Sequence, residues 1–161
     1  MAETANTNQT EFEITGPQSI RAERVFNAPY DRVLRAYTDA DEIAKWWGPR
    51  RFETVVDKFE PRAGGEWRLV HKGEAGEFGF HGVFHEVQTE APGRIVQTFE
   101  FEGAPGHVSL ETMTIEDLGG STRVRATSVY PSPEALDETI KVGMEGGLRE
   151  TYDRLAELVE A

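Results

Sequence analysis

The middle of the chain, from Phe52 to Tyr130, consists of six strand-like segments joined by short connections. Each segment is rich in β-branched and aromatic residues, and clusters of Gly and Pro separate one segment from the next. Parallel strands need crossovers of roughly a dozen residues or more, and these connections are shorter. The segments near 52–60, 66–72, 77–89, 94–102, 108–117 and 122–130 are therefore predicted to form an antiparallel meander.

A strand and two short helices precede this meander. Residues 19–26 alternate as a strand does, and Pro29 then suits the first position of a helix, where its missing N–H group needs no partner. Asp39 is placed to cap a second helix, with Glu42 three residues further on. Gly48-Pro49 ends that helix directly after two tryptophans, which predicts an apolar mouth or hinge where the chain returns to the sheet.

The chain closes with a long amphipathic helix. Ser132 can cap it, Pro133 suits its first turn, and we expect it to run to about Glu160. Its apolar positions recur at helical spacing: Leu136, Ile140, Met144, Leu148, Tyr152, Leu155 and Val159. We predict an α+β fold in which a curved antiparallel sheet wraps around this helix, with the two short helices after the first strand. Such packing leaves a pocket between sheet and helix, usually apolar with a few polar anchors.

The charge balance narrows the range of partners. Lys and Arg number 17 against 29 Asp and Glu, a net charge of −12, and so acidic a field repels nucleic acids and anionic membranes. No apolar run approaches the roughly 18 to 20 residues of a membrane span, and the N-terminus lacks the pattern of a signal peptide. We therefore expect a cytoplasmic protein that binds no nucleic acid and inserts into no membrane.

Metal, cofactor and thiol chemistry are not expected either. The chain has no cysteine, and it contains no phosphate-binding loop or dinucleotide fingerprint. His81 and His85 lie about 13 Å apart along one strand, too far for one metal ion to bind both. Residues 1–11 are predicted to form a disordered tail, and residues 12–161 a single domain, as the length suggests.

Ligand-contacting residues are expected among the large apolar side chains. The candidates are Trp46, Trp47, Trp67, Phe84, Phe99, Met113, Met144 and Leu148. The alternative is that each of them belongs to the ordinary core, because large apolar side chains are mostly buried. Gly143, Gly146 and Gly147 are unusual inside a helix. They either let the helix approach the sheet or kink, or they leave room for a ligand.

Polar anchors for such a ligand are few. Glu86 lies on a central strand, and Tyr152 on the last helix can present a hydroxyl group. If Glu86 points into the pocket, burial raises the pKa of its carboxyl and makes it an anchor or a proton donor. The alternative is an exposed position paired with an arginine such as Arg123 or Arg125. No residue is assigned a catalytic role from the sequence.

Several short motifs follow one another in an order that resembles a known family. They are Phe26-Asn-Ala-Pro29, Ala36-Tyr-Thr-Asp39, Trp46-Trp-Gly-Pro49, Gly64-Gly-Glu-Trp67, Gly82-Val-Phe-His-Glu-Val87, Ala91-Pro-Gly-Arg-Ile-Val96, Gly143-Met-Glu-Gly-Gly-Leu148 and Leu155-Ala-Glu-Leu158. Over roughly residues 19–161 the chain resembles the activator of heat-shock protein 90 ATPase-like branch of the START-like (SRPBCC, Bet v 1-like) superfamily. The resemblance implies a helix-grip fold with a hydrophobic cavity beneath the C-terminal helix. Relatives often carry Trp where this chain has Leu148, so the cavity is expected to differ in shape.

The resemblance implies binding of a small hydrophobic or amphipathic ligand, such as a lipid, sterol, polyketide or aromatic compound. The second hypothesis is an enzyme of the cyclase, dehydratase or hydrolase type that uses the same pocket. The third is an interaction module with a chaperone as partner. The co-chaperones that name the branch carry an additional N-terminal domain, for which this chain has no room, so we do not infer that activity from the name. No cofactor is expected, and we expect a monomer or a weak homodimer.

Overall fold

The computed structural model describes residues 9–161, which form one eight-stranded antiparallel sheet and four helices. Across the sheet the strand order is β1-β2-β8-β7-β6-β5-β4-β3, so β1 and β3 are the edges. The strands are β1 (Glu11–Gly16), β2 (Ser19–Phe26), β3 (Glu53–Phe59), β4 (Glu66–Gly73), β5 (Gly76–Gln88), β6 (Gly93–Phe101), β7 (Val108–Asp117) and β8 (Thr122–Val129). The six strands of the predicted meander are all present, each within one residue of its expected bounds.

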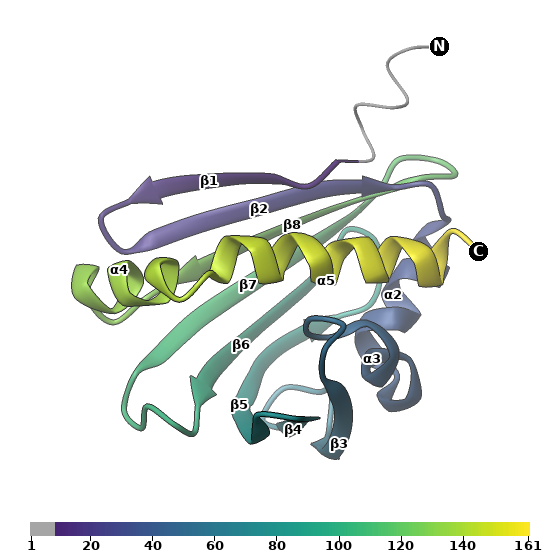
Figure 1. Cartoon of the computed structure of the whole chain (residues 1–161). Coiled ribbons are helices and arrows are strands. Elements are labelled where there is room, and N and C mark those ends of the chain that lie inside the picture. The colour runs from purple at the N-terminus through teal and green to yellow at the C-terminus, as the bar shows by residue number, and fades with distance from the viewer. Residues whose placement is uncertain (1–8) are drawn as a thin grey trace.

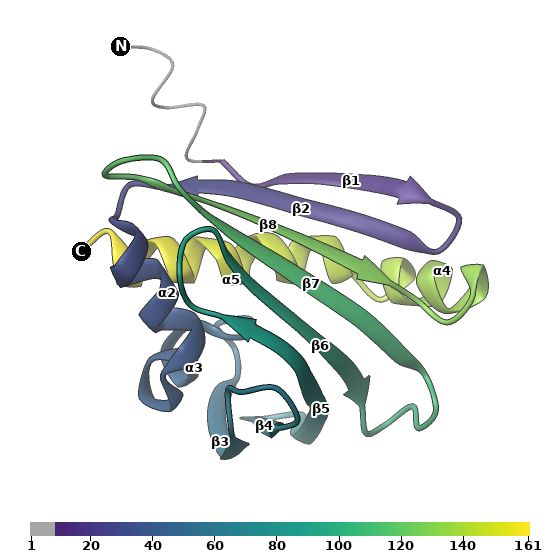
Figure 2. The same ribbon diagram turned by 180° about the vertical axis from the view of Figure 1, so that it is seen from behind.

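The helices gather on one face of this curved sheet. They are α2 (Tyr30–Thr38), α3 (Ala40–Trp46), α4 (Pro133–Lys141) and α5 (Met144–Val159). In Figure 1, α5 lies along the near face of the sheet, with α2 and α3 beside its C-terminal part. The view from behind in Figure 2 places β6, β7 and β8 in front of α5. This arrangement confirms the α+β helix-grip fold. None of the helices within residues 9–161 is long and apolar enough to cross a membrane.

Both short helices form where they are expected, although Pro29 is the residue before the first turn of α2 rather than its first helical residue. Pro29 precedes α2 directly, and its extended backbone leads the chain into the first turn at Tyr30. Asp39 caps α3, because its carboxylate accepts hydrogen bonds from the backbone N–H groups of Asp41 (2.8 Å) and Glu42 (3.2 Å). Gly48 follows with a positive φ of 91°, a conformation that favours glycine. These signals are local, so the sequence was sufficient to place both helices.

The C-terminal segment differs from its prediction because it forms two helices rather than one. Ser132 caps α4 as expected, with its hydroxyl accepting from the N–H group of Ala135 (3.1 Å). The helix then ends at Lys141, and α5 begins only at Met144. Gly143 between them has a φ of 91°, which breaks the helical path. The apolar spacing continues across this break, so periodicity alone does not reveal it.

The N-terminal end of the folded domain lies earlier than predicted. Residues 1–8 of the predicted tail lie outside the described residues. Thr10 is buried, and it accepts hydrogen bonds from Arg24 Nη1 on its hydroxyl (3.2 Å) and from Arg149 Nη1 on its carbonyl (2.5 Å). The edge strand β1 begins at Glu11. The predicted tail, residues 1–11, is therefore too long at its C-terminal end.

Candidate functional site

The face of the sheet toward α5 is its inner face. Along β6, β7 and β8, the side chains on this face are fully buried at one end and partly exposed at the other. Beside α2, α3 and the C-terminal half of α5, the inner side chains of Ile95, Ile115 and Val124 are at most 1% exposed. Further along the same strands and under the N-terminal half of α5, inner side chains keep part of their surface accessible: Gln97 and Phe99 on β6, Glu111 on β7, and Ala126 and Ser128 on β8. We call these regions the closed end and the open end.

Glu111 is the central residue of the open end. Cross-strand pairing places it between Gln97 on β6 and Ser128 on β8. Its carboxyl is buried by the surrounding protein, while the residue as a whole is half-buried. Burial raises the pKa of this carboxyl to about 7, although a hydrogen bond of 3.0 Å from the Gln97 amide opposes the shift. Near neutral pH the group is therefore close to half protonated.

Three tyrosines converge on Glu111 from other elements. Burial raises the pKa values of Tyr37 on α2, Tyr152 on α5 and Tyr130, which follows β8. The charge of Glu111 raises all three further, and for Tyr37 the neighbouring Tyr152 contributes more than Glu111 does. The Tyr37 hydroxyl is buried beside that of Tyr152, and the two interact, but within residues 9–161 it makes no hydrogen bond of normal geometry. A buried hydroxyl is normally satisfied, so this one has capacity for a further partner. We call Tyr37, Gln97, Glu111, Tyr130 and Tyr152 the interior polar cluster.

An aromatic wall stands next to this cluster. Phe99 lies two residues from Gln97 on the same face of β6, about 7 Å along the strand. Its ring centroid is 6.0 Å from that of Trp67, 5.6 Å from Phe80 and 6.4 Å from Trp47. Trp47 and Phe99 are only partly buried. A flat apolar molecule at the open end would therefore meet exposed ring surface.

His71 completes this wall on β4. Its ring stacks on Phe52 at 5.0 Å and lies 4.9 Å from Trp47. Burial, aided by the charges of Arg154 and Arg51, lowers the pKa of His71 to about 4, so the ring is neutral at physiological pH. A side chain at Gly48 would collide with the imidazole, because an added Cβ comes within 2.2 Å of Nε2. The tight Gly48 turn therefore holds Trp47 against this wall.

The predicted ligand-contacting residues divide between the packed core and the open end. Trp46 is core, since it is 3% exposed and its indole N–H donates to the Ala36 carbonyl (2.9 Å). Trp67, Phe84 and Met113 are also buried within the described core. Those that keep accessible surface are Trp47, Phe99, Met144 and Leu148, whereas Tyr152 is buried in the interior polar cluster. Of the partly exposed residues, the structure brings Trp47 and Phe99 together, and Met144 and Leu148 lie on the first turns of α5.

Glu86 does not belong to the interior. Its carboxylate accepts a hydrogen bond from Arg94 Nε (2.9 Å) on the outer face of the sheet. Phe84 faces inward, and simple alternation would carry Glu86 inward as well. A β-bulge between these two residues shifts the register, so Glu86 pairs with the outward-facing Val96. The alternative of an exposed glutamate paired with an arginine is the one that the geometry supports, with Arg94 as the arginine.

The glycines of the last segment leave room rather than permit close packing. A Cβ built on Gly143, Gly146 or Gly147 meets no atom within 4 Å. Close approach of helix and sheet is therefore not the reason for these glycines. Gly143 has a conformational role at the helix break, whereas Gly146 and Gly147 leave space beside the first turns of α5.

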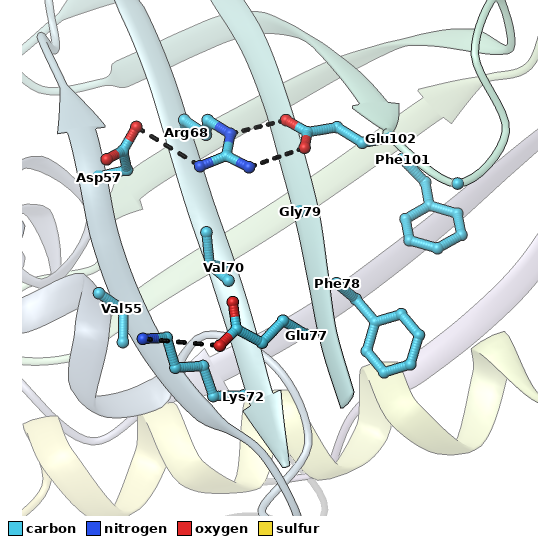
Figure 3. Close-up of a pocket in the computed structure, with 11 residues that line it drawn as sticks. Val55, Asp57, Arg68, Val70, Lys72, Glu77, Phe78, Gly79, Phe101 and Glu102 are labelled. Carbon is cyan, nitrogen blue, oxygen red and sulfur yellow. Dashed lines mark hydrogen bonds and ion pairs between the residues drawn. The ribbon is translucent and has the colours of Figure 1, made fainter. Parts of the chain in front are cut away.

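A hollow lies on the outer face of the sheet, over β3, β4 and β5 (Figure 3). Its volume is about 560 Å³, and its polar side chains are already paired with one another. Arg68 donates two hydrogen bonds of 2.8 Å to Glu102 and lies 3.5 Å from Asp57, while Lys72 lies 3.9 Å from Glu77. These pairings leave the hollow little unused bonding capacity, so it is the weaker candidate for a site.

Sequence reasoning missed Glu111, although a signal for it exists. In an unbroken strand, residues two apart share a face, and Glu111 precedes Met113 and Ile115 in that alternation. A glutamate in register with two apolar inner residues indicates an inward-pointing carboxyl. The approach of Tyr37, Tyr130 and Tyr152 depends on how the helices pack, which the local sequence does not determine.

Comparisons with known proteins place this geometry in context. The family model described as "Activator of Hsp90 ATPase homolog 1-like protein" matches residues 27–160. No curated protein is similar enough to count as a match.

Solved structures with a similar fold come from several organisms. A protein from Chromobacterium violaceum is 27% identical, with a TM-score of 0.76, and the alignment covers 91% of this chain and 99% of that one. A Rhodobacter sphaeroides protein is 23% identical, with a TM-score of 0.84 and coverage of 94% and 99%. One from Arthrobacter aurescens is 22% identical, with a TM-score of 0.83 and coverage of 96% and 92%. The last two likenesses show the fold alone.

Proposed function

The chain belongs to the activator of Hsp90 ATPase homolog 1-like family, and from this we propose that it binds a small hydrophobic or amphipathic molecule. The proposed binding site is the open end, between the sheet and the N-terminal half of α5. The observation that carries this proposal is the position of Glu111, a half-buried residue on the inner face whose carboxyl accepts one hydrogen bond, from Gln97, and has no basic partner within residues 9–161. A carboxyl held there lacks the full hydration it has in water, so its surroundings favour a bonded partner.

The composition of the open end supports this function. Small-molecule sites are mostly apolar and carry a few polar groups that fix the ligand's orientation. Here Phe99, Trp47 and Leu148 supply partly exposed apolar surface, and Glu111 and Tyr37 supply polar groups with unused bonding capacity. A ligand that combines an apolar body with one hydrogen-bonding group would satisfy both kinds of surface at once.

A thermal-shift screen tests the proposal. Melting of the purified chain is followed with fatty acids, sterols, flavonoids, aromatic polyketides and apolar amines. A ligand at 100 times its Kd stabilises a protein by about 2.7 kcal/mol. For a domain of this size that corresponds to a rise in Tm of about 5–10 °C. A dose-dependent rise with one chemical class is the expected result, and a flat screen with a well-folded protein would contradict the proposal.

Matched variants on α5 locate the binding space. Leu148→Trp adds bulk at the open end, whereas Leu158→Trp makes the same change about 15 Å further along the helix. Both leucines are partly buried against the core. We expect Leu148→Trp to weaken binding of any compound found in the screen and Leu158→Trp to preserve it. The reverse pattern would place the site elsewhere.

An enzyme that uses the same space is the second candidate function. A carboxyl whose pKa is about 7 is suited to transfer protons near neutral pH, and Glu111 takes the place that the sequence had suggested for Glu86. Once a ligand is known, its chemical conversion can be followed by mass spectrometry. A Glu111→Gln variant that binds the compound but no longer converts it would favour this reading. The interaction with a chaperone stays a prediction.

A further inference from the structure

The other carboxyls whose pKa values are shifted have a basic partner, and Glu111 does not. Lys58 lowers the pKa of Glu66, Arg50 that of Glu157, and Arg68, with His81, that of Glu102. Within residues 9–161, no Lys, Arg or His forms an ion pair with Glu111, whose one hydrogen bond comes from Gln97. The interior thus holds an ionisable carboxyl without an intramolecular cation.

We propose, building on the binding function above, that the ligand of the open end is an amine with an apolar body, whose protonated nitrogen pairs with Glu111. The carboxylate has a second oxygen beyond the one bonded to Gln97. An ammonium group carries three donors and no acceptor, so it complements the carboxylate oxygen that Gln97 leaves free. The ligand supplies the cation that the chain itself does not provide.

The groups around Glu111 suit an ammonium. The Tyr37 hydroxyl lies beside that of Tyr152 but makes no hydrogen bond of normal geometry within residues 9–161, so its oxygen can accept one from the amine. Aromatic rings attract cations over their faces, and Phe99 presents a partly exposed ring close to Gln97. The apolar body would then lie along the wall of Trp47, Phe80 and Phe99.

Charge over larger distances favours the same ligand class. The net charge of −12 attracts cations to the protein and repels anions. A fatty acid or another carboxylate would also place a second negative charge beside Glu111, which costs energy in a buried site. Among ligands of equal apolar size, the order of affinity should therefore be amine first, alcohol second and carboxylate last.

Three probes of nearly equal shape test this order. They are 2-(1-naphthyl)ethylamine, 2-(1-naphthyl)ethanol and 1-naphthaleneacetate, each titrated into the full chain at pH 7 by calorimetry. A charge-assisted hydrogen bond that contributes about 1.4 kcal/mol corresponds to a tenfold change in Kd, so we expect the amine to bind about tenfold more tightly than the alcohol. Equal binding of amine and alcohol, or tighter binding of the carboxylate, would overturn the inference.

Glu111→Gln and Glu86→Gln form a matched pair for this test. Both remove one carboxylate, and Glu86 lies on the outer face, paired with Arg94. We expect the preference for the amine over the alcohol to fall below about twofold in Glu111→Gln and to stay near tenfold in Glu86→Gln. A preference that survives in Glu111→Gln would refute the role of Glu111, and the comparison of probes in the unmodified chain does not depend on either variant folding.

Proton release gives an independent readout. An ammonium bound to Glu111 fixes the carboxyl in its charged form, so binding at pH 7 should release about half a proton from a group that is half protonated. Calorimetry in two buffers of different ionisation enthalpy measures this number. Zero release of protons, or their uptake, would contradict the pairing of the ammonium with Glu111.

The outcomes for the inference and for the proposed function can be told apart. If none of the three probes binds while other classes of compound raise the Tm, the inference fails and the proposed function stands. If no compound binds at all, the proposed function fails.

Discussion

The closed end and the open end of the inner face are built on the same strands and have opposite properties. At the closed end, Ile115 and Leu155 are fully buried, and apolar side chains fill the space between sheet and helix. Four residues from Ile115 on β7, Glu111 keeps accessible surface and a carboxyl without a basic partner. The difference indicates that stability comes mainly from the end covered by α2 and α3, which leaves the other end available for a ligand.

The largest expected effect separates two leucines of α5. Leu155 is 0% exposed at the closed end, whereas Leu148 is partly buried at the open end. Leu155→Ala removes buried apolar surface and leaves a cavity, so it should lower the free energy of unfolding by about 2–5 kcal/mol. Leu148→Ala should cost about 1 kcal/mol or less, because its surroundings are already partly open. Urea unfolding of both variants measures the two decreases in the free energy of unfolding. Equal decreases would contradict the distinction between the closed end and the open end.

The next effect is a pH dependence that belongs to Glu111. Its pKa is about 7 in the folded chain against an ordinary value of 4.5, so the folded state holds the proton longer. Stability from this group is fully present below pH 4.5 and is lost as the pH rises through 7. Relative to Glu111→Gln, the unmodified chain should lose on the order of 3 kcal/mol between pH 4.5 and 7.5.

Denaturant unfolding across this pH range measures the loss, with Glu86→Gln as the control. That variant should follow the unmodified chain, because Glu86 lies outside the interior. Parallel curves for Glu111→Gln and the unmodified chain would show that the Glu111 carboxyl is hydrated like a surface group, and the open end would then lack its proposed polar anchor.

The smallest effects concern the glycines that border the open end. Gly147 lies within α5 and an added Cβ meets no atom, so Gly147→Ala should raise the free energy of unfolding by about 0.5–1 kcal/mol. Gly143 has a φ of 91°, so Gly143→Ala should instead lower it by about 1 kcal/mol. Thermal unfolding distinguishes the two signs. A loss at both positions would mean that the space at Gly147 is not free.

The sequence predicted the fold better than the site, for physical reasons that particular residues illustrate. Strand positions follow from alternation and from turns such as Gly119-Gly120, which act locally. The break at Gly143 interrupts a helix whose apolar spacing continues, so pattern reasoning missed it. The β-bulge before Glu86 shifts the register of its strand, so this candidate polar anchor points outward, as the alternative reading expected. Tyr37 comes within reach of the charge of Glu111 only through tertiary packing, which no local pattern encodes.

A crystal structure of the chain with a compound that raises its Tm tests the central claim most directly. The claim is that the open end, and not the hollow around Arg68 on the outer face, is the binding site. We predict ligand density against Phe99 and Leu148, with its polar group within hydrogen-bonding distance of Glu111. Density in the outer hollow beside Arg68 and Glu102, with the open end unchanged, would contradict the account.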